Sequence, residues 1–539
     1  MSKNDPIILP QKYYLDYFNY LLEFVERQYD HILDQPEHLF YQSFRELSEP
    51  AQCLYLRFSN RRGHYFRINK ISYDEIPNVH EAKEELMHQG FIQINESDDP
   101  TQFRLFTKQE LVNLYDFLHP GQRKAEILME LSEVDLQVIH EKEEVAEVLK
   151  NEEVDFIKLL FFGRRGGQMT DFVIRDVGNV KIEKLDESKF KPWFESREEA
   201  LSVMHLSQLK KMITEIQEAG LPLEDYLEEM PWEAWLSYPR SSEIAEKLLL
   251  DVGYHFERML RSDLALYYYS HTDKSPARER KVRILDKMDQ KDDAIAIANQ
   301  MMENPANASE LTFATDFLNR KGIRIDRSMT RRLKKAPSIE IPPPDSTVER
   351  AVLSYFYEEG WDGLHAENYL WRGLFGLAFW NIIFDADHGS FHHPLQRQPS
   401  DLNDSIFFES RETLLREQLA KFRTRKQLIN HITRFHNEKI GIANRFVTWH
   451  ESLLHSLEIM IERLPLAGLK KVLLEMSKNM KENSAGFPDL FLWKEEDYQF
   501  YEVKSPNDHL SAQQLFWLDF LASAKIKVDV LRVNFKTHQ

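Results

Sequence analysis

The strongest constraint on this chain is a β-hairpin pattern near its C-terminus. Residues 486–493 and 498–504 are two runs rich in aromatic and aliphatic side chains, and every residue of the segment 494–497 between them is charged. Apolar runs of this length around a short polar connection are typical of paired antiparallel strands. The sequence therefore predicts a hairpin whose turn is centred between Glu495 and Glu496.

Two acids and a lysine meet on one face of this hairpin. In the predicted register Asp489 faces Glu502, with Cβ atoms about 5 Å apart, and Lys504 lies two residues further along the same face. Like charges opposite each other destabilise a hairpin unless something compensates them. A divalent cation is a natural compensator, because hard cations prefer oxygen ligands. The pattern therefore predicts a metal-dependent phosphodiesterase centre.

The residues of the hairpin resemble a known family. Pro488 and Asp489, followed by Glu502, Val503 and Lys504, are similar to the PD-(D/E)xK nuclease signature. Within that superfamily the chain resembles the VRR-NUC branch, and within that branch a bacterial-type member of the Fanconi-associated nuclease family. The resemblance lies in segments 486–489, 502–508 and 510–514. Weaker likeness covers most of the chain and includes segments 58–62, 70–76, 365–384 and 405–411.

The resemblance implies a set of metal ligands. Asp489 and Glu502 would hold one or two Mg²⁺ or Mn²⁺ ions, and the backbone carbonyl of Val503 would complete the ligand shell. Glu367, at the start of a helix expected over residues 366–384, would be a third acid. Taken alone, a glutamate in the first turn of a helix is explained by the helix dipole. The resemblance favours the metal.

The resemblance also implies two catalytic side chains that do not bind the metal. Lys504 would orient the attacking water or help to deprotonate it, and Gln514 would position Lys504 or a phosphate. A bound metal lowers the pKa of that water and stabilises charge on the scissile phosphate. The expected product carries a 5′-phosphate and a 3′-hydroxyl.

The length of 539 residues exceeds what one hydrophobic core supports, so two to four domains are expected. The fold class expected is α with α/β. The expected domains are a winged-helix-like DNA-binding domain (1–95), a SAP-like helical module (96–150), a tetratricopeptide-like helical-repeat domain (151–340) and a PD-(D/E)xK nuclease core with a mixed sheet (341–539). A basic run at 331–335 and prolines within 341–345 are typical of a linker before the last domain.

Basic residues in two places are candidates for binding DNA phosphates. The first group, interleaved with aromatic residues, consists of Arg57, Arg61, Arg62, Arg67 and Lys70. The second, in the helical middle of the chain, consists of Arg278, Arg280, Lys281 and Arg283. A solvated helix face explains each group about as well. The net charge of −19 runs against DNA binding, but phosphate contacts are local and screened beyond about 8 Å.

Other features limit the location of the protein. The sequence has no apolar run long enough for a membrane helix and no signal peptide at its start. Its one cysteine, Cys53, excludes an intramolecular disulfide and is expected to be a small buried side chain. A cytoplasmic protein without a membrane partner is expected, nucleoid-associated in a bacterium and nuclear in a eukaryote; protein partners are not indicated.

Two local patterns have competing interpretations. Residues 156–162 are a continuous apolar run that favours a strand, and the glycine-rich segment 163–167 after it is expected to be a turn, since it lacks the lysine and hydroxyl of a P-loop. His388, His392 and His393 are expected in a surface loop, because carboxylate or cysteine partners at zinc-site spacing are absent.

Together these features predict a structure-selective DNA nuclease of the phosphodiesterase I type. It would act as an endonuclease or exonuclease near 5′ flaps or branched DNA in DNA repair, including interstrand crosslink repair. Two alternatives stay open. One is a junction-resolving or single-strand nuclease of the same superfamily, and the other is a DNA-binding scaffold without catalysis.

Overall fold

The computed structural model describes residues 9–536, except 62, 179, 326–332, 334, 345, 389 and 507. Arg62 and parts of the predicted linker therefore lie outside the described residues. The chain divides into two compact units, one of residues 1–179 with 192–215 and one of residues 180–191 with 216–539. Within the described residues, no helix has both the length and the apolar character that a membrane crossing requires.

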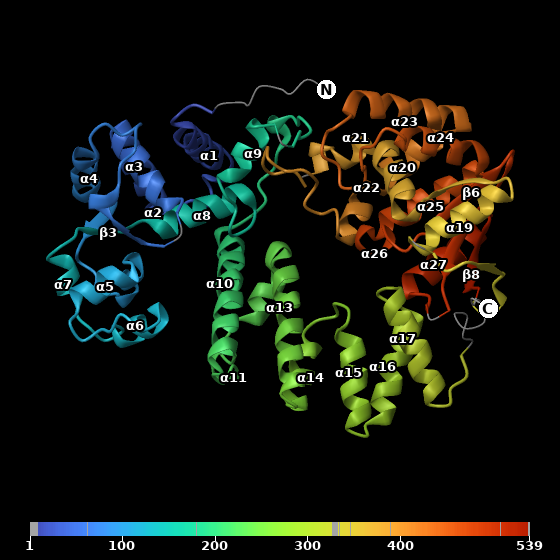
Figure 1. Cartoon of the computed structure of the whole chain (residues 1–539), viewed down its shortest axis with the longest axis horizontal. Helices are drawn as coiled ribbons and strands as arrows, with labels where there is room; N and C mark the ends of the chain where they lie inside the picture. The colour runs from blue at the N-terminus through green and yellow to red at the C-terminus, as the bar shows by residue number, and fades with distance from the viewer. Residues whose placement is uncertain are drawn as a thin grey trace. The chain divides into compact units, whose positions relative to one another are not determined.

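The first unit is helical with a small sheet (Figure 1). The sheet has the order β1-β3-β2, and both outer strands run antiparallel to β3. Because β3 follows the boundary predicted at residue 95, the sheet joins residues from both sides of it. The elements are α1 (Tyr13–Tyr29), α2 (Gln35–Glu46), α3 (Glu49–Ser59), β1 (Tyr65–Arg67), η1 (Ile68–Lys70), α4 (Val79–His88), β2 (Ile92–Ile94), η2 (Pro100–Leu105), α5 (Lys108–Leu114), α6 (Lys124–Glu130), α7 (Gln137–His140), β3 (Val145–Val148), α8 (Asn151–Phe162) and α9 (Thr170–Asp176).

The strand predicted for residues 156–162 is wrong, because these residues form the second half of helix α8. Seven residues of α8 are buried, including the four consecutive residues 159–162. A helix buried nearly all round shows no periodicity that separates it from a buried strand. Gly163, with φ of 68°, ends the helix in the left-handed conformation that glycine adopts without strain, and the predicted turn after it is confirmed.

The middle of the chain consists of helices, as its sequence predicts (Figure 1). The contacts of α13 with α14, α15 with α16 and α16 with α17 show that successive helices pack as hairpins. Helix α10 crosses the division between the two units. The elements are η3 (Glu187–Lys189), α10 (Arg197–Ala219), α11 (Glu224–Leu227), α12 (Trp232–Ser237), α13 (Pro239–Arg258), α14 (Ser262–Ser270), α15 (Ala277–Lys287), α16 (Lys291–Glu303) and α17 (Ala308–Arg320).

The C-terminal part contains a five-stranded mixed sheet with the order β4-β8-β7-β6-β5, which confirms the predicted fold class. β4, β8 and β7 run parallel to one another. β6 runs antiparallel to both of its neighbours, β7 and β5. Its elements are β4 (Ser338–Ile341), α19 (Val348–Glu358), β5 (Asp362–His365), β6 (Leu490–Lys494), β7 (Asp497–Lys504), α27 (Ala512–Ser523) and β8 (Val528–Phe535).

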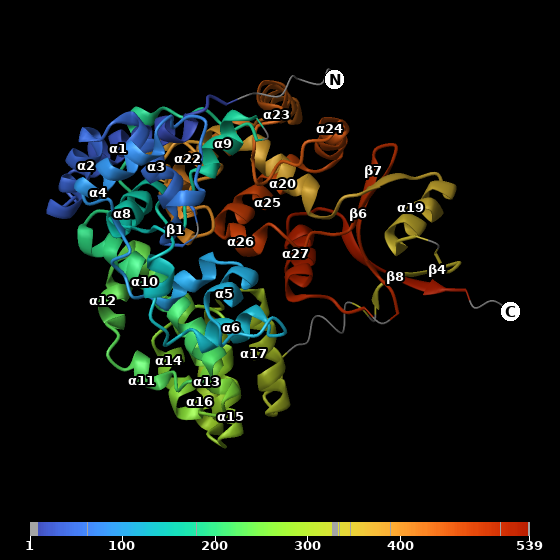
Figure 2. The same ribbon diagram turned by 60° about the vertical axis from the view of Figure 1, so that its left-hand side comes forward.

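Helices α19 and α27 cover opposite faces of this sheet (Figure 2). Val352 of α19 packs with Leu490 and Val503, whereas Leu518 of α27 packs with Val530. Neighbouring residues on a strand point to opposite faces. Glu502, next to Val503, therefore faces the side of the sheet that carries α27.

The helices between β5 and β6 support that same side (Figure 2). They are α20 (Glu367–Ala378), α21 (Trp380–Ile383), η4 (Ala386–His388), α22 (Ser405–Lys421), α23 (Arg425–Lys439), α24 (Leu453–Arg463), α25 (Leu466–Lys478) and α26 (Met480–Asn483). The single helix predicted over 366–384 is interrupted at Phe379, whose φ of −113° and ψ of 21° are not helical.

The surface loop predicted for the histidines is wrong for two of them. His392 and His393 are buried, with 4% and 7% of their surface exposed. Their backbone N–H groups donate to the side-chain oxygen of the buried Gln396 at 2.6 and 3.0 Å. The loop folds around this amide, which satisfies its backbone without a regular element.

Candidate active site

The hairpin has the register predicted from its turn. Leu490 pairs with Tyr501 and Lys494 with Asp497, so the turn is centred between the two glutamates. The next pair outward is Asp489 and Glu502. Asp489 Oδ2 accepts a hydrogen bond of 2.9 Å from the backbone N–H of Val503. This bond ties one acid to the strand that carries the other.

The side chains of Glu502, Lys504 and Gln514 each contact the other two. Lys504 Nζ lies 2.9 Å from Glu502 Oε1 and donates to Gln514 Oε1 at 3.1 Å. Gln514 Nε2 donates to the same Glu502 oxygen at 2.5 Å. The side chains of Glu502 and Lys504 are almost fully buried. The sequence prediction that these three residues come together is supported by this geometry.

Gln514 also belongs to the capping box at the start of α27. Ser511 is the N-cap, its hydroxyl accepts from the Gln514 N–H, and Gln514 Oε1 accepts from the Ser511 N–H at 2.9 Å. A capping box satisfies two backbone donors that a helix start leaves open. The local sequence signal that begins α27 therefore also fixes the amide that touches Lys504 and Glu502.

The electrostatics of the acid pair favour a cation. Burial raises the pKa of Glu502 to about 8, and the nearby Asp489 carboxylate adds to this effect while Lys504 opposes it. Burial raises the pKa of Asp489 as well, against the lowering effect of its bond from Val503. Glu502 Oε2 is buried and has no hydrogen-bond partner in the part of the chain that the structure describes. Two crowded carboxylates with an unsatisfied buried oxygen fit a hard divalent cation.

Glu367, the predicted third acid, is placed beside the pair by its backbone. The N–H groups of Ala366 and Glu367 donate to the carbonyl oxygen of Asp489 at 2.7 and 3.1 Å. The Glu367 side chain is exposed and bonded by Asn368 Nδ2 at 3.3 Å. Among the described residues no three His, Cys, Asp or Glu side chains gather closely enough to hold a metal ion. The metal role of Glu367 therefore stays a prediction, as does that of the Val503 carbonyl.

The backbone of Glu367 is unusual for a residue with a side chain. Its φ is +32° at the first position of α20. Non-glycine residues adopt positive φ at a cost and are enriched at functional sites. Here the conformation directs two successive N–H groups to one carbonyl of the acid-bearing segment.

The sequence interpretation missed two residues that hold this segment. Asn368 Oδ1 accepts from the Phe487 N–H at 3.2 Å. The Phe487 ring stacks between Trp371 of α20, at 5.4 Å, and Trp517 of α27, at 4.0 Å between centroids. Aromatic pairs of this kind add stability beyond their buried area. Both residues sit next to acids in the sequence, but nothing in their spacing predicts these contacts.

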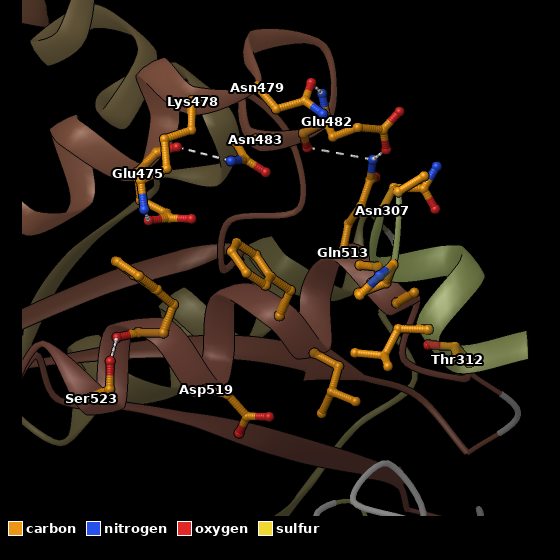
Figure 3. Close-up of a pocket in the computed structure, with 18 residues that line it drawn as sticks. Asn307, Thr312, Glu475, Lys478, Asn479, Glu482, Asn483, Gln513, Asp519 and Ser523 are labelled. Carbon is orange, nitrogen blue, oxygen red and sulfur yellow. Dashed lines mark hydrogen bonds and ion pairs between the residues drawn. The ribbon is translucent and has the colours of Figure 1, made fainter. Parts of the chain in front are cut away.

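A cavity of about 630 Å³ lies along α27, on the side of Gln513 (Figure 3). Gln513 points toward Glu482 of α26 and donates to its Oε2 at 3.1 Å. Residues of α17, α25, α26 and α27 line the cavity. Gln513 and Gln514 are neighbours in the first turn of α27, so the cavity borders the helix that carries one wall of the acid site.

Most of the basic residues predicted to bind DNA are paired with carboxylates. The pairs in the first group are Arg57 with Glu75, Arg67 with Glu110 and Glu143, and Lys70 with Glu110. In the second group they are Arg278 with Glu310, Arg280 with Glu257 and Arg283 with Glu279. Arg61 is exposed beside the Tyr73 ring and Lys281 is half-buried. The role of both groups in DNA binding stays a prediction. At each paired residue, a DNA phosphate would compete with the carboxylate partner.

Comparison with known proteins agrees with this geometry. A family model described as the VRR-NUC domain matches residues 423–535, and one described as the FAN1 HTH domain matches residues 12–93. The hairpin that carries Asp489 and Glu502 lies inside the segment that matches the VRR-NUC domain.

Some relatives align over nearly the whole chain and others over about a third of it. A Fanconi-associated nuclease 1 homolog of Pseudomonas aeruginosa is 28% identical over 99% of this chain and 97% of its own length. The homolog of Schizosaccharomyces pombe is 34% identical over 35% of this chain and 27% of its own length. A crystal structure of paFAN1 bound to 2nt 5′ flap DNA with a gap covers 99% of this chain, with a TM-score of 0.86 and 27% identity. Along nearly its whole length the chain is therefore similar to Fanconi-associated nuclease 1 proteins.

Proposed function

We propose that this protein is a structure-selective, metal-dependent DNA nuclease that cuts near 5′ flaps or branched sites during DNA repair, interstrand crosslink repair included. The observation that carries the proposal is the pair of the half-buried Asp489 and the buried Glu502, with Lys504 bonded to the second acid. The likeness to a protein whose structures contain 5′ flap DNA supports the choice of substrate. Activity on chromosomal DNA agrees with the cytoplasmic, nucleoid-associated location predicted for a bacterial-type member.

Each side chain of the site has a distinct task in this proposal. Asp489 and Glu502 hold Mg²⁺ or Mn²⁺, which supplies acidity to a bound water and positive charge near the scissile phosphate. Lys504 orients that water, and its ammonium charge favours loss of the water proton. Gln514 keeps Lys504 and Glu502 in their contact. The water oxygen would bond to phosphorus as the bond to the 3′ oxygen breaks. The water loses a proton to solvent and the 3′ oxygen takes one from solvent, which leaves a 5′-phosphate and a 3′-hydroxyl.

The proposal is tested with end-labelled DNA and the purified chain. A 5′ flap, a four-way junction, a single strand and a linear duplex are incubated with Mn²⁺ or Mg²⁺, with and without chelator. Metal-dependent cutting of the flap above the linear duplex is expected. Preferred cutting of the junction or the single strand would favour the other nuclease types of the superfamily. Binding of all branched forms without any cutting would favour a scaffold and refute the proposal.

A further inference from the structure

Two arginines without carboxylate partners lie together on the α20 side of the nuclease domain. Arg372 of α20 donates through its exposed Nη2 to the backbone carbonyl of Arg445 at 2.8 Å. The Arg445 side chain is exposed and donates to Asn403 Oδ1. Within the described part of the chain, no Asp or Glu forms an ion pair with either arginine. This distinguishes them from the paired arginines of the two groups considered above.

The surroundings of the two arginines offer more donors than acceptors. Arg372 Nε and Asn444 Nδ2 are both buried, and neither has an acceptor among the described residues. A Cβ atom on Gly376 would lie 3.3 Å from Asn444 Oδ1, so the segment with Asn444 and Arg445 packs on α20 one turn beyond Arg372. Buried donors without partners cost free energy, and native structures contain few of them. An anion beside the exposed Arg445 side chain would supply acceptors to its guanidinium N–H groups.

The charges also favour an anion. Burial lowers the pKa of the Arg372 guanidinium, and the positive charge of Arg445 lowers it further. Each of the two guanidinium groups carries one positive charge. Two like charges held together repel each other unless an opposite charge lies between or beside them. The fold therefore holds a local positive site in a chain whose net charge is −19.

The position of this site relates it to the acid pair. Helix α20 begins at Glu367, whose N–H group donates to the Asp489 carbonyl. Arg372 lies five residues further on, which corresponds to about 7.5 Å along the helix axis. One helix therefore carries Arg372 and the backbone groups that bind the Asp489 segment.

We propose that Arg372 and Arg445 form a binding site for a backbone phosphate of the DNA that the acid pair cuts, an inference that rests on the proposed nuclease function. Guanidinium groups match phosphate oxygens with paired hydrogen bonds, and they remain charged when partly buried. The site fixes the register of the strand without reading its bases, as phosphate contacts do in general.

The test measures binding separately from cutting. Arg372→Gln, Arg445→Gln and Arg445→Lys are placed in an Asp489→Asn background, and the affinity for a fluorescent 5′ flap duplex is measured without metal between 50 and 200 mM KCl. The matched control is Arg416→Gln, an exposed arginine of α22 in the same unit that pairs with Glu412. Cutting by the same arginine variants with Asp489 intact is measured in parallel with Mn²⁺.

Each glutamine variant is expected to weaken binding about tenfold at the lowest salt, and to reduce the slope of log affinity against log salt by about 1. Arg445→Lys should keep the slope, and Arg416→Gln should resemble the parent. If Arg372→Gln does not fold, the exposed Arg445 variants decide alone. A slope equal to the parent in Arg445→Gln overturns the inference, even if affinity falls. A reduced slope in a protein that never cuts DNA would refute the nuclease function and retain the phosphate site.

Discussion

Asp489 Oδ2 accepts a hydrogen bond of 2.9 Å from the backbone N–H of Val503, the residue between Glu502 and Lys504. The separation of the two acids is therefore set by the register of a β-hairpin and not by flexible side chains. Lys504 is held in turn by Glu502 and Gln514. A site fixed in this way needs little rearrangement when a metal and a phosphate bind, which is a condition for efficient catalysis.

Removing either the first acid or the lysine is expected to abolish cutting while the fold is kept. Asp489→Asn removes a metal ligand but preserves the acceptor for Val503, and Lys504→Ala removes the charge beside the water. Each should lower the rate of flap cutting by about 10²–10⁴-fold. The rate is measured under single-turnover conditions, and folding by circular dichroism.

The control for these variants is Glu496→Gln in the turn of the same hairpin, an exposed acid outside the site. It should cut at the rate of the parent. Cutting at the parental rate by Asp489→Asn or Lys504→Ala would end the assignment of the site.

Ionisation of Glu502 is expected to destabilise the metal-free protein as pH rises. Its pKa is raised from 4.5 in the unfolded chain to about 8 in the fold. Below pH 4.5 the carboxyl is protonated in the folded and the unfolded protein, so it does not change the free energy of unfolding there. As pH rises from 4.5 to about 8, the carboxyl lowers the free energy of unfolding by a growing amount. Glu502→Gln removes this cost and should stabilise the chelated protein at pH 9 by up to about 5 kcal/mol relative to its effect at pH 4.5.

The measurement is urea unfolding of both proteins with chelator at several pH values. Glu412→Gln, an exposed acid on α22, is the control and should show no such trend. A difference between Glu502→Gln and parent that is constant from pH 4.5 to 9 would show that Glu502 ionises like an exposed acid.

The core of the site could be predicted because its residues are close in sequence. The charged turn determines the hairpin register, and with it the pairing of Asp489 and Glu502. Ser511 and Gln514 start α27 by a capping box that sequence spacing reveals. Such local rules act over a few residues, so they need no knowledge of the tertiary fold.

Features that depend on distant residues could not be predicted. The apolar run 156–162 becomes a helix because its neighbours in space cover all its sides. The sequence suggests that Arg67 is exposed. In the structure it is bonded to Glu110 and Glu143, which are 43 and 76 residues away in the chain. The contact of Asn368 with Phe487 spans 119 residues. A single sequence carries no local signal for such pairings.

Gln514 is expected to act through Lys504 and Glu502 and not only through the cap of α27. Ser511→Ala removes the N-cap hydroxyl, and it should lower stability by about 1 kcal/mol with little effect on cutting. Gln514→Ala removes the cap partner together with the contacts to the site, and it should also lower cutting by about 10- to 100-fold. Urea unfolding and single-turnover cutting are measured for both. Equal loss of cutting in the two variants would assign Gln514 a structural role alone.

Glu367 is expected to contribute its carboxylate, although its side chain is exposed in the metal-free structure. Glu367→Gln keeps the side-chain size and removes the charge, so it should raise the Mn²⁺ concentration for half-maximal cutting about tenfold. Glu367→Gly removes the carboxylate and also relieves the backbone at φ of +32°, so it should be more stable than Glu367→Gln by about 1 kcal/mol while needing as much metal.

Mn²⁺ affinity is measured by calorimetry without DNA, and stability by urea unfolding. Glu496→Gln in the turn of the hairpin, an exposed acid outside the site, is the control. Parental Mn²⁺ affinity in both Glu367 variants would contradict a third metal ligand at this position and leave the helix start as the only role of Glu367.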